Sequence, residues 1–162
     1  MKKWFFVISI LAISFSACKK DKGCTSLAPT TVATATESAY LQNYLSANSI
    51  TASEKNGMYY VISAQGAGTS PNLCSTITAD YVGNLINGTT DGAQFDASTA
   101  NKPLVIGLNQ LIAGWQVVLP LVKAGGTLTL YIPPSLGYGS QASGPIPANS
   151  YLKFVITLKA VQ

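Results

Sequence analysis

The chain has 162 residues, of which 48% are hydrophobic and 10% charged, and its formal net charge is +4. This composition supports one packed domain with a tail and excludes a largely disordered chain. The sequence contains neither arginine nor histidine, and its domain has no basic cluster. These absences argue against nucleic-acid binding and against histidine-based acid–base or metal chemistry, so we expect no cofactor and no metal.

The first residues have the layout of a secretory signal peptide. Two lysines are followed by an apolar segment, residues 4–17, which is shorter than the roughly 20 residues that a membrane span requires. The sequence Phe15-Ser-Ala-Cys18 at its end resembles a bacterial lipobox. By that resemblance, residues 1–17 are removed and Cys18 is acylated, which tethers the protein to a membrane facing the periplasm. The alternative is an ordinary signal peptide cut nearby, with Cys18 left as a free thiol.

Two further observations bear on the exported protein. Lys19 follows Cys18 where an aspartate commonly retains lipoproteins at the inner membrane, so the outer membrane is favoured. Cys24 and Cys74 form an even pair, which in an oxidising compartment indicates a disulfide bond. The alternative is that Cys74 is a small buried residue and Cys24 is free.

The segment before the domain is expected to hold a linker and one helix. Residues 18–36 are rich in threonine and other small residues, which predicts a linker. Apolar residues at positions 40, 41, 44 and 45 predict a helix over 37–47, started by Thr36 or Ser38, within a segment 37–56 that ends in a connector. We expect this helix to pack against the domain. One short helix supports pairing with a second chain poorly, so we expect a monomer.

From residue 57 onwards the pattern is that of β-structure. Apolar alternation between turn signals predicts strands over 57–63, 76–85, 94–97, 103–108, 127–132 and 151–161. One helix is predicted over 111–121, shortened by Pro120, and a loop rich in Gly, Ser and Pro over 135–149. The expected fold of domain 57–162 is therefore α+β, an antiparallel five- to six-stranded half-barrel sheet wrapped on one short helix.

Aromatic residues recur at the edges of these elements or beside glycines. They are accompanied by two acids, Asp80 and Asp96, and by aliphatic residues. This is the composition of an apolar pocket with one or two polar groups, and not that of a hydrolase. Taken singly, each aromatic residue is more often core, and Asp96 is as well explained as a turn cap. The pocket set is Tyr81, Phe95, Trp115, Tyr138 and Phe154, with Ile106, Leu111, Ile112 and Ile146.

Several segments resemble, in order and spacing, the FKBP family of peptidyl-prolyl cis-trans isomerases. No single motif is specific, but they occur in the family's order and, with the final strand Leu152–Leu158, extend over about the last 85 residues. They are Asp80-Tyr81-Val82-Gly83, Phe95-Asp96-Ala97-Ser98, Asn101-Lys102-Pro103-Leu104, Leu111-Ile112-Ala113-Gly114-Trp115, Gly125-Gly126-Thr127, Tyr131-Ile132-Pro133, Leu136-Gly137-Tyr138-Gly139 and Pro145-Ile146-Pro147.

The resemblance implies isomerisation of X–Pro bonds in exported proteins, in aid of their folding. It also implies a role for each residue. Trp115 would be the floor under the prolyl ring, and the Ile112 N–H and the Tyr138 hydroxyl would donate hydrogen bonds to substrate carbonyls. Asp96 would hold a polar contact at the pocket's edge. Tyr81, Phe95 and Phe154 would form the walls, and Leu104, Ile106, Leu111 and Ile146 would add substrate-binding surface.

The departures from the family pattern are a first turn, Gly88 to Gln94, that is longer by a few residues, and the loss of two polar groups. Ala100 stands where members often carry a basic residue, so Asp96 is expected to lack its usual partner, and the histidine of the long loop is missing. These losses bear on catalytic strength rather than on the fold. Rotation about the X–Pro bond makes and breaks no bond, so the reaction requires no general base, nucleophile or metal. Two alternatives stay open: a catalytically weak FKBP-like binding or chaperone module that uses loop 135–149, and a structural lipoprotein that does not use the pocket.

Overall fold

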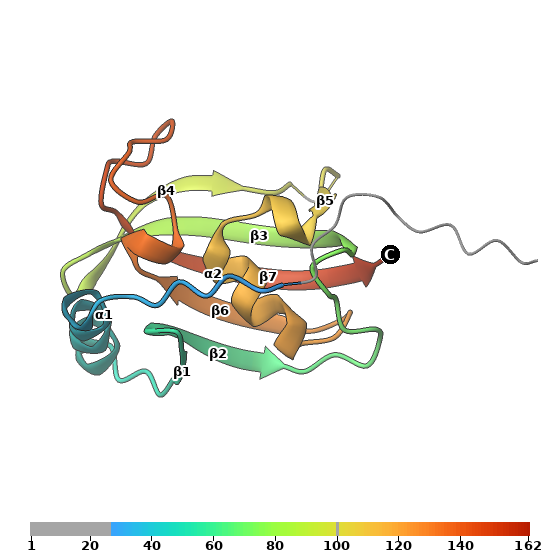
Figure 1. Ribbon diagram of the computed structural model, residues 1–162, viewed down its shortest axis with the longest axis horizontal. Coiled ribbons are helices and arrows are strands. Elements are labelled where there is room, and N and C mark those ends of the chain that lie inside the picture. The colour runs from blue at the N-terminus through green and yellow to red at the C-terminus, as the bar shows by residue number, and fades with distance from the viewer. Residues whose placement is uncertain (1–26, 100) are drawn as a thin grey trace, which may run out of the picture.

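The computed structural model describes residues 27–99 and 101–162, and in this part of the chain the sheet has seven strands. Figure 1 shows the sheet with α2 lying across one face and α1 at one end. The elements are α1 (Ala35–Ala47), β1 (Ser53–Lys55), β2 (Met58–Ala64), β3 (Thr76–Asn87), β4 (Thr90–Ala97), β5 (Leu104–Gly107), α2 (Ala113–Val118), β6 (Thr127–Ile132) and β7 (Tyr151–Val161), with 3-10 turns η1 (Leu108–Gln110), η2 (Leu119–Leu121) and η3 (Pro134–Leu136).

All neighbouring strands in the sheet are antiparallel. Their order is β1-β2-β6-β7-β3-β4, and β5 pairs with β3 beside β4. The expected α+β fold, an antiparallel sheet on a short helix, is confirmed. The strand that the sequence did not predict is β1, a three-residue edge strand inside the segment expected to hold only a helix and a connector.

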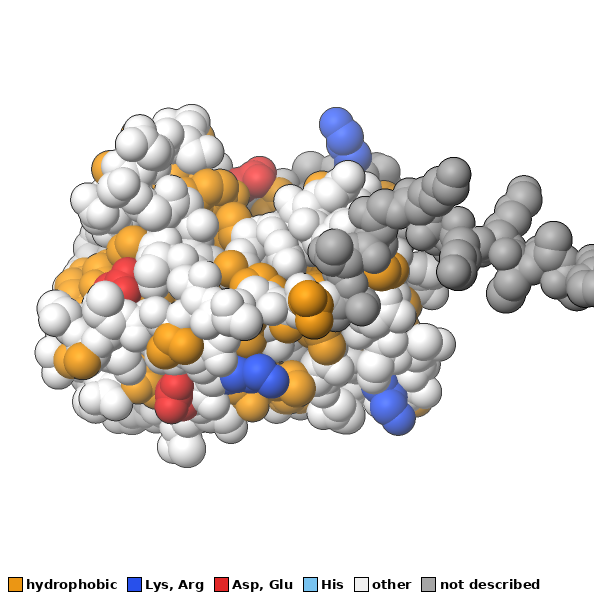
Figure 2. All heavy atoms as spheres, in the orientation of Figure 1, with side chains coloured by type: hydrophobic (Ala, Val, Ile, Leu, Met, Phe, Trp, Pro, Cys, Tyr) orange, Lys and Arg blue, Asp and Glu red, His pale blue; other side chains and the backbone are white. Residues whose placement is uncertain are grey.

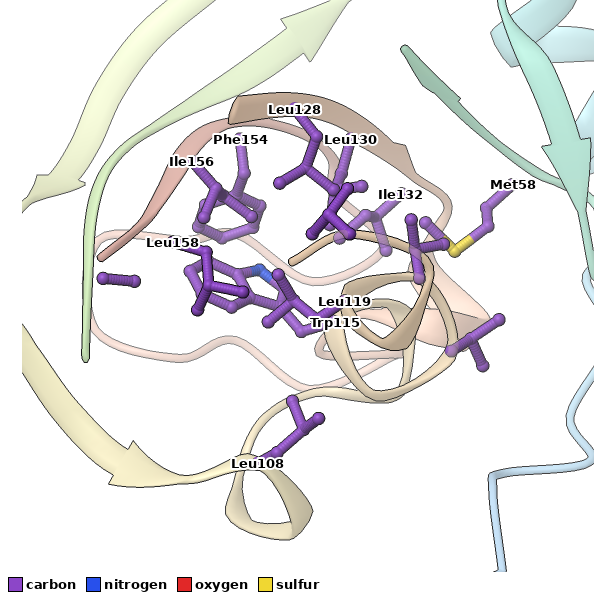
Figure 3. Close-up of a cluster of buried hydrophobic side chains, with 14 of the residues drawn as sticks. Met58, Leu108, Trp115, Leu119, Leu128, Leu130, Ile132, Phe154, Ile156 and Leu158 are labelled. Atoms are coloured by element: carbon purple, nitrogen blue, oxygen red, sulfur yellow. The ribbon is translucent and has the colours of Figure 1, made fainter. Parts of the chain in front are cut away.

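The main core lies between α2 and the inner face of the sheet. Successive side chains of a strand point to opposite faces, so alternate residues of β6 and β7 enter this core. Burial of each contributes about 1.5–3 kcal/mol relative to exposure. Figure 3 shows these side chains gathered around Trp115 and Leu119; those of the two strands are Leu128, Leu130, Ile132, Phe154, Ile156 and Leu158.

The predicted helix over 111–121 is divided in two. Its α-helical part ends at Val118, and η2 continues with Pro120, whose missing N–H cannot join the α-helical hydrogen-bond pattern. Gly114 lets this short helix approach the sheet closely, because a Cβ there would lie 2.8 Å from the Ile132 Cδ1. The helix therefore sits deep against β6.

Helix α1 packs on the opposite face of the sheet. Tyr59 and Tyr131 contact it, whereas their chain neighbours Met58 and Leu130 belong to the main core. The sequence predicted that Thr36 or Ser38 starts this helix, but the helix begins earlier, at Ala35. Thr34 is the N-cap: its hydroxyl accepts the N–H of residue 37, and the carboxylate of that residue accepts the Thr34 N–H. This reciprocal capping box explains the earlier start.

Charged side chains are scattered singly over the face drawn in Figure 2. Within the described ranges, no helix is long and apolar enough to cross a membrane. The predicted signal peptide, Cys18 and Cys24 lie outside the described residues. Cys74 is disulfide-bonded, and its pairing with Cys24 stays a prediction.

Asp91 links α1 to the sheet. Its Oδ1 accepts a hydrogen bond from the Tyr44 hydroxyl at 2.5 Å, and its Oδ2 lies 2.7 Å from the Lys153 Nζ. Burial opposes the charge of Asp91, but the hydrogen bonds from Lys153 and Tyr44 outweigh it and hold the pKa of the carboxyl below its ordinary value of 3.8. The ionised form of Asp91 therefore stabilises the folded chain.

We predict that Asp91→Asn lowers the free energy of unfolding by about 0.5–1 kcal/mol at pH 7, since the pair is partly exposed. Because the pKa is lower in the folded chain, this contribution is present above about pH 4 and is lost as the pH falls through the folded pKa. Urea unfolding of wild type and variant at pH 7 and pH 2.5 checks this. A difference that does not shrink at the lower pH would contradict it.

Candidate active site

A cavity of about 200 Å³ opens between α2 and the strands β3, β4 and β7. Nearly all the residues predicted from the sequence line it together, although they come from segments spread over more than seventy positions. The sequence prediction missed Gln110, which nothing in its local pattern marked. The lining residues are Tyr81, Phe95, Asp96, Leu104, Gln110, Leu111, Ile112, Trp115, Tyr138 and Phe154.

Four aromatic rings of the cavity contact one another in edge-to-face or tilted pairs. The Trp115 ring meets Phe154 edge-on with centroids 5.3 Å apart, and Tyr81 edge-on at 5.7 Å. Phe95 meets Phe154 in the same way at 5.4 Å. Edge-to-face pairs of this kind are favourable by about 0.5–1.5 kcal/mol beyond their burial. The rings therefore form a rigid apolar box, and Trp115, only 2% exposed, is its base.

Strand register explains how the rings of two different strands meet. Gly83 of β3 stands opposite Phe154 of β7 on one side and Asp96 of β4 on the other. A Cβ at Gly83 would lie 2.6 Å from the Phe95 Cζ and 2.9 Å from the Phe154 Cε1. Glycine is therefore required here, and the space above it is filled by the two rings. In the sequence, Gly83 belongs to the family-like segment Asp80-Tyr81-Val82-Gly83, but nothing in that segment indicates this role.

Asp96 is hydrogen-bonded, although the basic residue expected to be missing is not its partner. The Tyr81 hydroxyl donates a short hydrogen bond to its Oδ2, and its Oδ1 accepts the Ala97 N–H at 2.9 Å. Burial raises the pKa of Tyr81, and the hydrogen bond to Asp96, the charge of Asp96 and the neighbouring Tyr138 raise it further. The phenol thus keeps its proton and donates to the carboxylate, for which family members often have a basic partner.

The segment before α2 is held in place by Gln116. Its Nε2 donates to the Leu111 carbonyl at 2.6 Å and to the Asn109 carbonyl at 3.3 Å. The Ile112 carbonyl accepts the Trp115 N–H and so begins the helix. The Ile112 N–H has no hydrogen-bond acceptor within the described part of the chain, so it is available to a carbonyl in the cavity.

Two predicted residues are not part of the cavity lining. Ile106 of β5 stands opposite Ile77 and packs against the core. Ile146 lies in the long loop, where it borders a second hollow of about 310 Å³ together with Phe95, Asp96 and Tyr138. Ile146 thus lies beside the cavity rather than in it, and Ile106 packs against the core.

Tyr138 closes the cavity from the turn after η3. It is 38% exposed, and the N–H groups of its neighbours Gly137 and Gly139 both bond to the Pro134 carbonyl. Gly139 has a φ of +67°, a conformation that favours glycine. Burial, followed by the charge of Asp96, raises the pKa of the Tyr138 phenol, so the hydroxyl can act as a donor.

These features define an α+β domain with a preformed, ring-lined cavity and two phenol hydroxyls, and they agree with comparisons to known proteins. Residues 68–159 match the family model described as "FKBP-type peptidyl-prolyl cis-trans isomerase". The chain belongs to this family.

Curated relatives match a comparable stretch of the chain. FkpA of Buchnera aphidicola (Schizaphis graminum) is 44% identical over 105 residues, which are 64% of this chain and 40% of that protein. Mip of Coxiella burnetii is 39% identical over 109 residues, 66% of this chain and 46% of that protein. The chain thus spans less than half the length of these relatives.

Solved structures share the fold. Escherichia coli FkpA superposes with a TM-score of 0.63 at 31% identity, covering 78% of this chain and 62% of that one. A peptidyl-prolyl cis-trans isomerase from Pseudomonas syringae gives 0.65 at 27% identity, covering 79% and 94%.

We predict that Gly83→Ala lowers the free energy of unfolding by about 1–3 kcal/mol, because the added methyl group overlaps two packed rings. It should also displace the Phe95 ring, which NMR chemical shifts of that ring would report. The matched control is Gly107→Ala, whose methyl meets the ends of two flexible side chains, those of Asn109 and Gln110, instead of packed rings. Equal effects of the two substitutions would contradict the role given to Gly83.

Proposed function

We propose that the chain catalyses cis–trans isomerisation of X–Pro bonds in polypeptides. The observation that carries this proposal is the box of four rings based on Trp115, in a chain of the FKBP-type family. A prolyl ring fits such an apolar cavity, and the lining residues offer no nucleophile–base pair for a competing chemistry.

The barrier to rotation comes from amide resonance and is about 18–20 kcal/mol. The planar amide is more charge-separated than the twisted one, so an apolar cavity stabilises the twisted state relative to the planar state. Trp115 would support the prolyl ring while Tyr81, Phe95 and Phe154 enclose it. Only interactions that are stronger in the twisted state raise the rate.

Two donors supply such interactions. The Ile112 N–H lies at the start of α2, and the Tyr138 hydroxyl lies across the cavity. Each would hold a substrate carbonyl, and the Tyr138 proton is retained because its pKa is raised. The Tyr81–Asp96 hydrogen bond keeps the one carboxylate of the cavity paired, which limits the cost of leaving a charge beside a bound apolar ring.

The surroundings of the cavity suit an extended polypeptide. Asp96 borders three hollows: the cavity itself, the one beside Ile146, and a third of about 480 Å³ that runs past Ser98 and Lys102. With the proline in the cavity, the residues before and after it would find space in the two neighbouring hollows. We therefore propose proline-containing polypeptides as substrates, rather than isolated small molecules.

We further propose that the protein is exported and held at a membrane by acyl chains on Cys18. The apolar segment 4–17 and the lipobox-like sequence before Cys18 support this, and one relative, from Legionella longbeachae, is named "Outer membrane protein MIP". Its substrates would then be polypeptides folding outside the cytoplasm.

We predict that the full chain, purified in a mild detergent, accelerates isomerisation of a short X–Pro peptide in a protease-coupled assay. Tyr138→Phe should lower kcat/KM by about threefold to tenfold, the effect of one lost hydrogen bond. Tyr60→Phe, on β2 and away from the cavity lining, is the control and should keep full activity. A folded wild-type chain that gives no acceleration would refute the proposed activity and favour a binding module.

We predict that Cys18→Ala moves the protein from the membrane fraction to the soluble fraction of the expressing bacterium. Several acyl chains give stable attachment to a membrane, and the substitution removes the residue that would carry them. The shift should therefore be nearly complete. Fractionation and intact mass show it. Cys24→Ala is the control and should stay with the membrane; an unacylated wild-type protein would contradict the anchor.

A further inference from the structure

We propose that Glu37 of α1 is a positioning residue for the isomerase site, because it fixes the turn that carries Tyr138. The inference rests on the proposed function and adds to it a residue outside both the cavity and the segment 68–159 that matches the family model. Figure 1 shows the turn after β6 next to α1 at one end of the sheet.

The contact is made by both oxygens of one carboxylate. Glu37 Oε1 accepts the Ser135 N–H at 2.9 Å, and Oε2 accepts the Ser135 hydroxyl at 3.0 Å. Oε2 also accepts the Thr34 N–H at 2.8 Å and the Thr34 hydroxyl at 3.0 Å. Burial opposes the charge of Glu37, but these hydrogen bonds outweigh it and lower the pKa of the carboxyl. The Glu37 carboxylate therefore accepts hydrogen bonds at the start of both α1 and η3.

The turn η3 needs this support because of its own sequence. Pro133 is its N-cap and Pro134 its first residue, so neither has an N–H, and no side chain of the turn caps it. Ser135 is the first residue of the turn with a backbone donor, and such a donor has no partner within a helical turn. Glu37, 98 positions earlier, supplies the missing acceptor.

The turn carries this restraint to Tyr138. Leu136 is fully buried, and the N–H groups of Gly137 and Gly139 bond to the Pro134 carbonyl at 3.0 and 2.9 Å. Tyr138 lies between those two glycines, with its side chain in the cavity. Fixing Ser135 therefore fixes the base of a closed turn whose tip holds the phenol.

Helix α1 is itself a firm support. The Tyr40 hydroxyl accepts the Gly88 N–H at 2.6 Å, and the Tyr40 ring stacks on Tyr151 with centroids 3.8 Å apart. Gln42 donates to the Tyr59 hydroxyl at 2.7 Å, and Leu41 is fully buried. The helix is thus joined to three parts of the sheet, and Glu37 extends that rigid unit to the turn.

The test compares Glu37→Ala with Glu54→Ala in the full chain. Glu54 also accepts a backbone N–H, that of Gly57 at 2.7 Å, but in the β1–β2 turn. Glu37→Ala should lower kcat/KM about threefold to tenfold, mainly through kcat, because a misplaced donor weakens the rate-raising interaction. Glu54→Ala should leave it unchanged. Thr34→Ala, which weakens the α1 cap without touching Ser135, should cost stability but little activity.

A double-mutant cycle separates positioning from general destabilisation. If Glu37 acts through the Tyr138 hydroxyl, Glu37→Ala should reduce kcat/KM in wild type but by less than twofold in the Tyr138→Phe background. Equal fold-losses in the two backgrounds would overturn the inference. So would an activity loss in Thr34→Ala that equals the loss in Glu37→Ala.

Amide hydrogen exchange gives a result that does not depend on catalysis. In Glu37→Ala, exchange at residues 135–139 should rise by at least tenfold while β6 and β7 stay protected. If the wild-type chain proves inactive but this exchange pattern is found, the proposed function fails and the anchoring of the turn stands. Unchanged exchange at these residues would refute the anchoring, whatever the activity.

Discussion

The pairing of β3 with its neighbours is the constraint on which the candidate site depends. β3 pairs with β7 from Ile77 to Ile86 on one side and with β4 and β5 on the other. Tyr81 and Phe154 reach the same cavity only in this register, because a shift by one residue would turn either side chain to the other face of the sheet. Gly83 then leaves the space in which rings from β4 and β7 meet. Fold stability and cavity shape thus depend on the same strand contacts.

The cavity has one carboxylate among mainly apolar lining residues. The only carboxylate of the lining, Asp96, is paired with a phenol rather than with a basic side chain. A neutral partner satisfies the carboxylate without bringing a second strongly hydrated group into an apolar site. The charge pair found nearby, Asp80 with Lys159, lies between β3 and β7 and outside the cavity lining. Burial raises the pKa of both phenols of the cavity, Tyr81 and Tyr138, so both keep their protons near neutral pH and can donate hydrogen bonds.

Local patterns in the sequence predicted the parts of the fold that local forces determine. The strands β6 and β7 were placed to the residue, because their alternation is regular, Gly126 and Pro133 flank β6, and the loop rich in Gly, Ser and Pro precedes β7. The start of α1 was misplaced although Thr34 and Glu37 have capping-box spacing, since the linker's threonines obscured the signal. The Tyr81–Asp96 bond and the packing role of Ile106 depend on how β4 and β5 share the edge of β3, which no local pattern reveals.

The cavity has an apolar half and a polar half, and they are supported differently. The rings of Tyr81, Phe95, Trp115 and Phe154 stand on paired strands and a buried helix, and they hold one another through direct contact. The Tyr138 hydroxyl stands on a turn that begins with two prolines and cannot satisfy its own first N–H. Because the turn cannot cap itself, its support has to come from another element, and α1 provides it from the far end of the sequence. The helix before the family domain is thereby tied to the group that would contact the rotating bond.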